Sequence, residues 1–385
     1  MYYVSRVLEE CLDVKFRVKL ELERILDEES RVRSLKDWHA RRAPIPCGMT
    51  IHTGLGCSYG CTYCYIYDMG FTTKPIRYPI SGEELVYALV NNKHFYPGLQ
   101  GTLLAFGSIT EPFQKNTLNR ALEYLKVTWN YLKNPQQVST KSYLDLEIAK
   151  SIRKISDPKI NILVTIITIS KSKLLEPNAP PPEVRFETIS VLSSLRFNVY
   201  LFLRPLIPGV ISYDEVLRVL SKAVEAGVKG VVVGGFRATD GNIKRMKALG
   251  LNLDDIFKRL PRIPKGREQV PIRIGDIKNR VLKAVNEYGL KAYPSSCSVN
   301  IESHGLACTA CSMGPCGDLS KLPIVDEDVV QVFRDKLGIN VIDVKEVNRY
   351  NVEFITNRIS SEKVSILKHV AVSIFKRKAR IRVVK

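Results

Sequence analysis

Long hydrophobic runs are missing from this sequence: no apolar stretch approaches the ~20 residues that a membrane-spanning helix needs. Internal repeats and low-complexity tracts are also missing. The first ten residues already contain Arg6, Glu9 and Glu10, unlike a cleavable targeting segment. We therefore expect a cytoplasmic protein without a membrane span.

Acidic residues are scarce relative to basic ones. The 39 Asp and Glu residues face 58 Lys and Arg residues, which gives a formal net charge of +19. Such a surplus favours anionic partners such as nucleic acid, phosphates or an acidic membrane surface, without choosing among them. Hydrophobic residues make up 45% of the chain and charged residues 25%, which excludes disorder as its main state. The length of 385 residues suits one full-sized core with an appended module.

The nine cysteines are not scattered. Three lie between Cys57 and Cys64, and four lie between Cys297 and Cys316. Because a reducing cytosol disfavours structural disulfides, two tight groups predict metal or iron–sulfur ligation. We interpret the remaining two, Cys11 and Cys47, as packing residues.

Short β-branched runs alternate with amphipathic helices over most of the chain. Residues 1–42 read as helical, and Pro44 and Pro46 end that segment. The pattern predicts helices around Leu118 to Leu132 and around Val216 to Ala223. Six strands are predicted: Met49–Thr53, Leu103–Phe106, Gln137–Thr140, Ile162–Ile169, Val199–Leu203 and Gly230–Val233. This alternation predicts an α/β fold of parallel strands, an open sheet or partial (β/α)6 TIM-type barrel with its active site at the carboxyl ends of the strands.

Three regions follow from this pattern. We expect an N-terminal helical segment over residues 1–42, the partial barrel over 43–260 and a C-terminal extension over 261–385. Pro261, Pro264, Gly266 and Pro271 mark the expected linker. The extension is expected to be α+β, with a helix near Ile277–Tyr288 ahead of the second cysteine group.

The first cysteine group combines three thiols with small residues. Three residues separate Cys57 from Cys61, and two separate Cys61 from Cys64. A [4Fe-4S] cluster usually takes four cysteines, so three leave one iron open for another ligand. Structural zinc prefers a closed set of four ligands, and only His52, inside a predicted strand, could complete one here. The loop also follows the first predicted strand, where this fold places its active site.

Cys57, Cys61 and Cys64, with the aromatic Tyr63 before the last, resemble the motif of the radical S-adenosylmethionine (SAM) superfamily. The resemblance implies a partial six-stranded barrel. It also implies that SAM binds the open iron through its amino and carboxylate groups. One electron from the cluster would then cleave SAM to a 5′-deoxyadenosyl radical that abstracts hydrogen.

Further segments resemble the DNA repair photolyase or spore photoproduct lyase-like branch. The resemblance implies that Ser108 and Lys141 contact SAM and that Thr165 is a further candidate, alongside Tyr63. A lysine at a strand end could neutralise a carboxylate, or it could simply be solvated. Glu111 and Arg185 could serve the site or fix loops. The segments are Gly107–Gln114, Ser139–Ser142, Leu175–Pro180 and Arg204–Gly209.

One segment departs from that branch. Photoproduct lyases carry a hydrogen-donating cysteine after the second strand, where this chain reads Ala105-Phe106-Gly107-Ser108. The sequence therefore argues against repair of thymine dimers.

The second cysteine group forms a complete four-thiolate set of Cys297, Cys308, Cys311 and Cys316. Either a structural zinc ion or a second, auxiliary [4Fe-4S] cluster fits four thiolates, and a site without metal is the third alternative. His304 is a candidate fifth ligand or an exposed loop residue.

The C-terminal end is basic. From Lys363 onward it contains eight Lys or Arg residues and no acid. Alternation of Lys378, Arg380 and Arg382 with apolar residues predicts an edge strand, whose basic face could follow phosphates or protect the edge.

Three functions remain open at this point. The first is a radical SAM enzyme acting on nucleic acid, with an electron donor of the ferredoxin or flavodoxin type. The second is a radical SAM enzyme that uses an auxiliary cluster on a peptide, lipid or small molecule. The third is a non-catalytic iron–sulfur or zinc binding protein.

Overall fold

A computed structural model describes residues 2–45 and 48–384. Its centre is a sheet of seven strands that run parallel. The outer strands, β1 and β11, do not pair with each other, so the sheet forms an open, partial barrel. The α/β fold predicted from the sequence is confirmed. In spatial order the strands are β1 (Gly48–Ile51), β4 (Leu103–Phe106), β5 (Gln136–Thr140), β6 (Asn161–Thr165), β7 (Asn198–Leu206), β8 (Gly230–Gly235) and β11 (Lys291–Tyr293).

The six predicted strands are present, and two of them end earlier than expected. β1 ends at Ile51, two residues before the predicted end at Thr53. β6 ends at Thr165, four residues before the predicted end at Ile169. The apolar run continues because Ile166 and Ile167 are fully buried in the loop. The Glu215 carboxylate accepts the backbone N–H of Ile169 at 2.6 Å, which gives this buried loop a hydrogen-bond partner outside the sheet. The seventh strand, β11, lies beyond residue 260, so the sheet draws one strand from the region expected to form the extension.

Helices between the strands cover the sheet. In α5 the buried face centres on Ala121, Tyr124 and Thr128, with Leu125 and Leu132, rather than only on the large aliphatic residues. In α9 the four predicted positions from Val216 to Ala223 are all buried. The helices along the barrel are α4 (Gly82–Asn91), α5 (Leu118–Leu132), α6 (Leu146–Ile155), α7 (Ser172–Leu175), α8 (Pro182–Ser194), α9 (Tyr213–Ala226), α10 (Asp240–Ala248), α11 (Asp254–Arg259) and α12 (Gly275–Glu287). Short two-stranded pairs are β2 (Gly54–Leu55) with β3 (Ile76–Arg77) and β9 (Arg237–Ala238) with β10 (Val270–Pro271).

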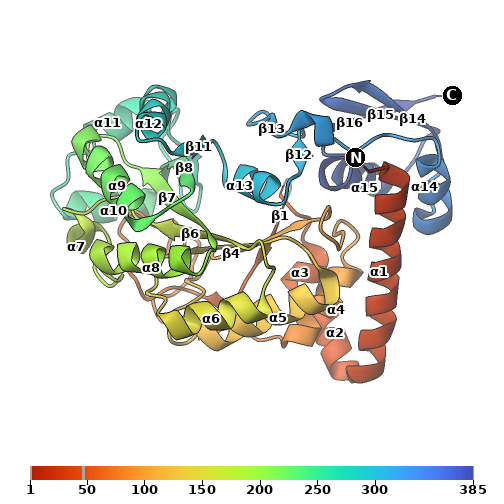
Figure 1. Cartoon of the computed structure of the whole chain (residues 1–385), viewed down its shortest axis with the longest axis horizontal. Helices are drawn as coiled ribbons and strands as arrows, with labels where there is room; N and C mark the ends of the chain where they lie inside the picture. Colours follow the sequence, from red (N-terminus) through yellow and green to blue (C-terminus); the bar gives the residue numbers. More distant parts are fainter. Residues whose placement is uncertain (1, 46–47, 385) are drawn as a thin grey trace.

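The two ends of the chain pack together, as Figure 1 shows. The first half of α1 (Val4–Ile25) shares a second hydrophobic core with the C-terminal elements, and Val4 N donates to Ile324 O at 2.9 Å. We call the part that α1 forms with residues 324–384 the C-terminal unit. The predicted N-terminal helical segment divides into α1, α2 (Glu28–Lys36) and α3 (Trp38–Arg41). In the described part of the chain, each helix is too short or too polar to cross a bilayer.

The C-terminal unit contains a three-stranded sheet with a basic edge. β16 (Lys378–Val383) is an outer strand, as the alternation predicted. It pairs in parallel with β15. Lys376 and Arg377, which precede it, are buried instead of belonging to the exposed basic face. The remaining elements are α13 (Ser296–Ser303), β12 (Ala307–Cys308), β13 (Cys316–Gly317), the 3-10 helix η1 (Leu319–Lys321), α14 (Val329–Leu337), β14 (Val341–Asn348), β15 (Asn351–Thr356) and α15 (Ser361–Ser373).

Candidate functional site

A cavity of about 180 Å³ opens at the carboxyl ends of the barrel strands. We call it the mouth cavity. Its lining includes the residues that follow β4 and β5 and the ends of β6, β7 and β8. All seven residues predicted for the first cysteine site and for SAM line this one cavity: Cys57, Cys61, Cys64, Tyr63, Ser108, Lys141 and Thr165.

The cysteine loop has a backbone that favours glycine at two points. Gly56 has a φ of +87°, and a Cβ there would lie 2.3 Å from Thr72 O. Gly60 has a φ of +66° and also adopts the left-handed conformation. The Tyr67 hydroxyl donates to Cys57 O and accepts from Gly60 N, each at 3.0 Å. The loop is therefore held in one conformation around the thiols.

Helix α10 holds the other end of this loop. The Arg245 guanidinium donates to Cys64 O at 2.6 Å and to Thr62 O at 3.1 Å, and it forms an ion pair with Asp68 at 2.8 Å. Asn242 donates to Tyr63 O at 3.0 Å. Arg245 and Asn242 were not predicted from the sequence, because nothing near residue 240 indicates that this helix contacts a loop some 180 positions earlier.

The three thiols of the loop are free and surround the cavity. Burial raises the pKa of Cys57 to about 11, and it also raises the pKa values of the Cys61 and Cys64 thiols. In a cubane each thiolate binds its own iron, and the ligands surround the cluster. Three thiols are one fewer than the closed set of four that structural zinc prefers. The trio therefore fits a cluster with one open iron better than a zinc ion.

His52, the residue that could have completed a zinc set, lies outside the cavity. It is buried and packs against the rings of Trp38, His39 and Tyr78, with centroids 4.6, 5.3 and 5.9 Å away. The described lining residues include no histidine and no fourth cysteine. Cys11 is buried elsewhere, and its thiol donates to Pro97 O at 2.8 Å, as expected of a packing residue. Cys47 lies outside the described residues.

Glu176 connects several of the predicted residues. Its carboxylate forms an ion pair with Arg185 at 2.5 Å and lies 3.8 Å from Lys141 Nζ. It also accepts the Tyr63 hydroxyl. Although burial disfavours the ammonium, Cys61 and Glu176 raise the pKa of Lys141, which keeps it charged. Since the side chains of Glu176 and Arg185 are 0% exposed, they hold the site from behind, and Arg185 donates to Thr165 O at 3.0 Å.

Glu111 plays a similar structural role at the end of β5. Its carboxylate accepts the backbone N–H of Lys141 at 2.9 Å and the Thr140 hydroxyl. Burial raises the pKa of Glu111, against the lowering effect of these hydrogen bonds. Glu111 therefore orients the segment that carries Lys141.

The far wall of the mouth cavity is cationic and aromatic. Arg204 at the end of β7 lies over the Phe202 ring, 5.8 Å from its centroid, and Arg237 lines the same wall. Gly234 makes room for this arginine, since a Cβ there would lie 2.6 Å from Arg204 Cδ. In the described part of the chain no carboxylate forms an ion pair with Arg204, and burial together with Arg237 lowers its pKa. Arg204 and Arg237 give this wall positive charge, which suits an anionic group.

The second cysteine group lines a separate cavity of about 30 Å³, which we call the base cavity. Cys297, Cys308, Cys311 and Cys316 all contribute to it. His304 does not: its side chain is 3% exposed and its Nε2 contacts Asp157 Oδ2 at 2.8 Å. Both sequence interpretations of His304, a fifth ligand and an exposed loop residue, are therefore wrong.

Comparisons with known proteins agree with this geometry. Spore photoproduct lyase, solved as a cysteine-to-serine mutant, superimposes with a TM-score of 0.52 at 13% identity over 65% of this chain and 78% of that one. A double mutant of that enzyme, with bound AdoMet and dinucleoside spore photoproduct, gives 0.52 at 12% identity over 69% and 85%. The barrel therefore has the fold of spore photoproduct lyase. The resemblance inferred from the sequence is confirmed at the level of the fold.

Sequence comparisons match a smaller share of the chain. No family model matches the chain. The uncharacterized protein MJ0683 of Methanocaldococcus jannaschii is 25% identical over 177 residues, which cover 43% of this chain and 63% of that protein. The chain thus matches less than two thirds of this relative's length.

Proposed function

We propose that this protein is an enzyme that reductively cleaves SAM at a [4Fe-4S] cluster held by Cys57, Cys61 and Cys64. The observation that carries the proposal is the cavity at the carboxyl ends of the strands, whose described lining has three thiols and no fourth cysteine or histidine. Such a trio leaves one iron open to SAM. The cluster would supply the electron that turns SAM into methionine and a 5′-deoxyadenosyl radical.

The residues around the trio suit the polar ends of SAM. Lys141, held by Glu176 beside the cavity, carries the charge that would neutralise the SAM carboxylate. Ser108, which is exposed in the cavity, would contact the amino group. Tyr63 and Thr165 line the same cavity.

Anaerobic reconstitution tests this function. With iron, sulfide, a strong reductant and SAM, the chain should form 5′-deoxyadenosine and methionine, measured by chromatography. Cys61→Ala should abolish the product and the iron at the first site, whereas Cys11→Ser should retain that iron because Cys11 lies in another core. Absence of 5′-deoxyadenosine from a chain loaded with about four irons would leave only the non-catalytic alternative.

The favoured substrate is nucleic acid. Arg204 and Arg237 offer guanidiniums to phosphate, and Phe202 and Tyr65 offer ring faces on the same wall. The net charge of +19 would strengthen binding to a polyanion. Since Ala105–Ser108 contains no cysteine, we propose a reaction other than thymine dimer repair. A peptide, lipid or small-molecule substrate is the alternative.

Binding of labelled tRNA and DNA at low salt tests the substrate class. We expect affinity that falls with increasing salt, and a reduction of about tenfold for Arg204→Gln. The matched control is Arg262→Gln, an exposed arginine that pairs with Glu268 and does not line the mouth cavity. No binding at low salt, or equal losses in both variants, would contradict a nucleic acid at this wall.

The same proposal includes an electron donor of the ferredoxin or flavodoxin type and a cytoplasmic location. It also includes a metal at the second cysteine group, either zinc or a second cluster.

A further inference from the structure

The two cavities lie at opposite ends of the same strands. The base cavity is lined by Leu103, the first residue of β4, and by Pro135, which precedes β5. The mouth cavity is lined by Gly107 and Thr140, at the other ends of these strands. At ~3.3 Å per residue, the four residues of β4 alone separate the two ends by roughly 13 Å. A metal at the base therefore cannot touch a substrate at the mouth.

Tight backbone turns bring the four cysteines to the base cavity. Cys308 on β12 pairs in register with Cys316 on β13. Between them, Gly314 is closed in by the backbone: a Cβ there would lie 3.3 Å from Cys308 O and 3.6 Å from Cys311 O. The fourth thiol, Cys297, comes from α13. What the structure supplies is this backbone framework, while the thiols themselves do not converge on a point.

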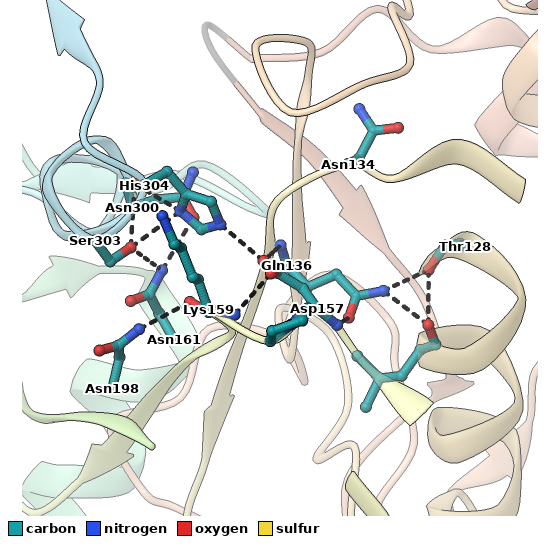
Figure 2. A network of polar contacts seen from close by, with 12 residues as sticks. Thr128, Asn134, Gln136, Asp157, Lys159, Asn161, Asn198, Asn300, Ser303 and His304 are labelled. Atoms are coloured by element: carbon teal, nitrogen blue, oxygen red, sulfur yellow. Dashed lines mark hydrogen bonds and ion pairs between the residues drawn. The ribbon is translucent and has the colours of Figure 1, made fainter. Parts of the chain in front are cut away.

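A buried polar network anchors α13 to the amino ends of the barrel strands, as Figure 2 shows. His304, just after α13, contacts Asp157, which also accepts from Gln136 N at 3.2 Å. Asn161 at the start of β6 donates to Asn300 Oδ1 at 3.0 Å. The helix that carries Cys297 is thus fixed to the barrel.

The other side of the base cavity belongs to the C-terminal unit. Lys376, which follows α15, lines the cavity with only 5% of its surface exposed, and its Nζ donates to Gln100 O at 2.8 Å. Thr309, next to Cys308, donates to Lys376 O at 2.8 Å and to Arg349 O at 2.6 Å. A buried ammonium beside four thiols would offset the negative charge of a tetrathiolate site. The barrel, the segment that carries the second cysteine group and the C-terminal unit all meet at the base cavity.

We propose that Cys297, Cys308, Cys311 and Cys316 bind one zinc ion, which fastens the C-terminal unit to the base of the barrel and takes no part in the radical chemistry. Four thiolates are the closed ligand set of structural zinc. The site lies at the base of the barrel, separated from the mouth by the length of the strands, which suits a structural ion rather than a group that handles substrate. An auxiliary cluster that binds substrate, as in the second sequence hypothesis, has no access to the mouth.

Metal analysis of a chain that keeps only the second group tests the identity of the ion. The full-length variant C57A/C61A/C64A should contain about one zinc per chain and no sulfide. Its cobalt-loaded form should show the intense absorption of tetrahedral cobalt bound to thiolate. Iron and sulfide in this variant, or no metal at all, would overturn the proposal. Because the first group is removed, this result is independent of whether the intact protein cleaves SAM.

A second measurement, on the wild-type chain, tests the fastening. Chelating zinc from the wild-type chain should increase amide hydrogen exchange at least tenfold in residues 296–317, while the core strands β5 to β7 keep their protection. Cys308→Ser should lose the zinc, and Cys11→Ser, which removes a buried thiol outside the set, should retain it. Unchanged exchange after zinc removal, or zinc retained by Cys308→Ser, would refute the fastening role.

Discussion

The two ends of the barrel carry cysteine groups that differ in number, space and surroundings. The mouth has three thiols around about 180 Å³, with cations facing the cavity, whereas the base has four thiols around about 30 Å³. An incomplete ligand set beside open space suits a reaction, and a complete set around a smaller space suits a structural ion. The comparison teaches that the number of ligands and the free volume together separate a reactive site from a structural one.

The largest expected effect is at the mouth. Replacing Cys57, Cys61 or Cys64 with Ala should remove the iron–sulfur absorption and lower 5′-deoxyadenosine formation by more than about a hundredfold. Visible spectra and product chromatography measure both. If a variant that lacks one of these three cysteines still holds a full cluster, the contrast between an open ligand set at the mouth and a closed one at the base would be lost.

Buried charge behind the mouth should matter next. Glu176→Gln leaves the Arg185 guanidinium buried without its counter-charge, and we expect a loss of about 3–5 kcal/mol in unfolding free energy. Urea denaturation measures this loss. The control is Asp240→Asn, which removes the exposed ion pair with Lys244 and should cost less than about 0.5 kcal/mol. Equal costs for the two would show that Glu176 does not hold the site.

Acidification should weaken the mouth end of β1. Burial, helped by His39 and opposed by Asp37, lowers the pKa of His52 to about 3. Below about pH 6.5, the pKa of His52 in the unfolded chain, the unfolded chain binds a proton that the folded chain excludes. The free energy of unfolding therefore decreases as the pH decreases. We expect a loss of about 2 kcal/mol between pH 7 and pH 5, measured by denaturation at each pH. His52→Gln should reduce the dependence of the unfolding free energy on pH. An unchanged dependence would show that His52 does not cause it.

The smallest expected effect is at the base. Asp157→Asn keeps the size of the side chain and one acceptor oxygen, which can serve Gln136 N or Lys159 N but not both, and it removes the charge beside His304. We expect a loss of about 1 kcal/mol by urea denaturation. Loss of the zinc from this variant would mean that the polar network, and not only the thiols, maintains the metal site.

Several features of the fold could be read from local patterns. The β-branched runs located the strands, and the spacing of Val216, Val219 and Leu220 located the buried face of α9. Tyr63, Ser108, Lys141 and Thr165 lie far apart in the sequence, yet each follows or ends a strand, and parallel strands bring their carboxyl ends together. The extent of the C-terminal unit was missed, because the pairing of α1 with residues 324–384 leaves no local signal.

The sequence by itself determined the two cysteine groups, the alternation that makes a parallel barrel and the cationic surplus, because spacing, periodicity and charge are properties of the local chain. Only the tertiary structure decided that the groups lie at opposite ends of the strands, that α10 holds the first loop and that Arg204 has no ion-pair partner among the described residues. These depend on contacts between residues that are distant along the chain, and a single sequence contains no record of such contacts.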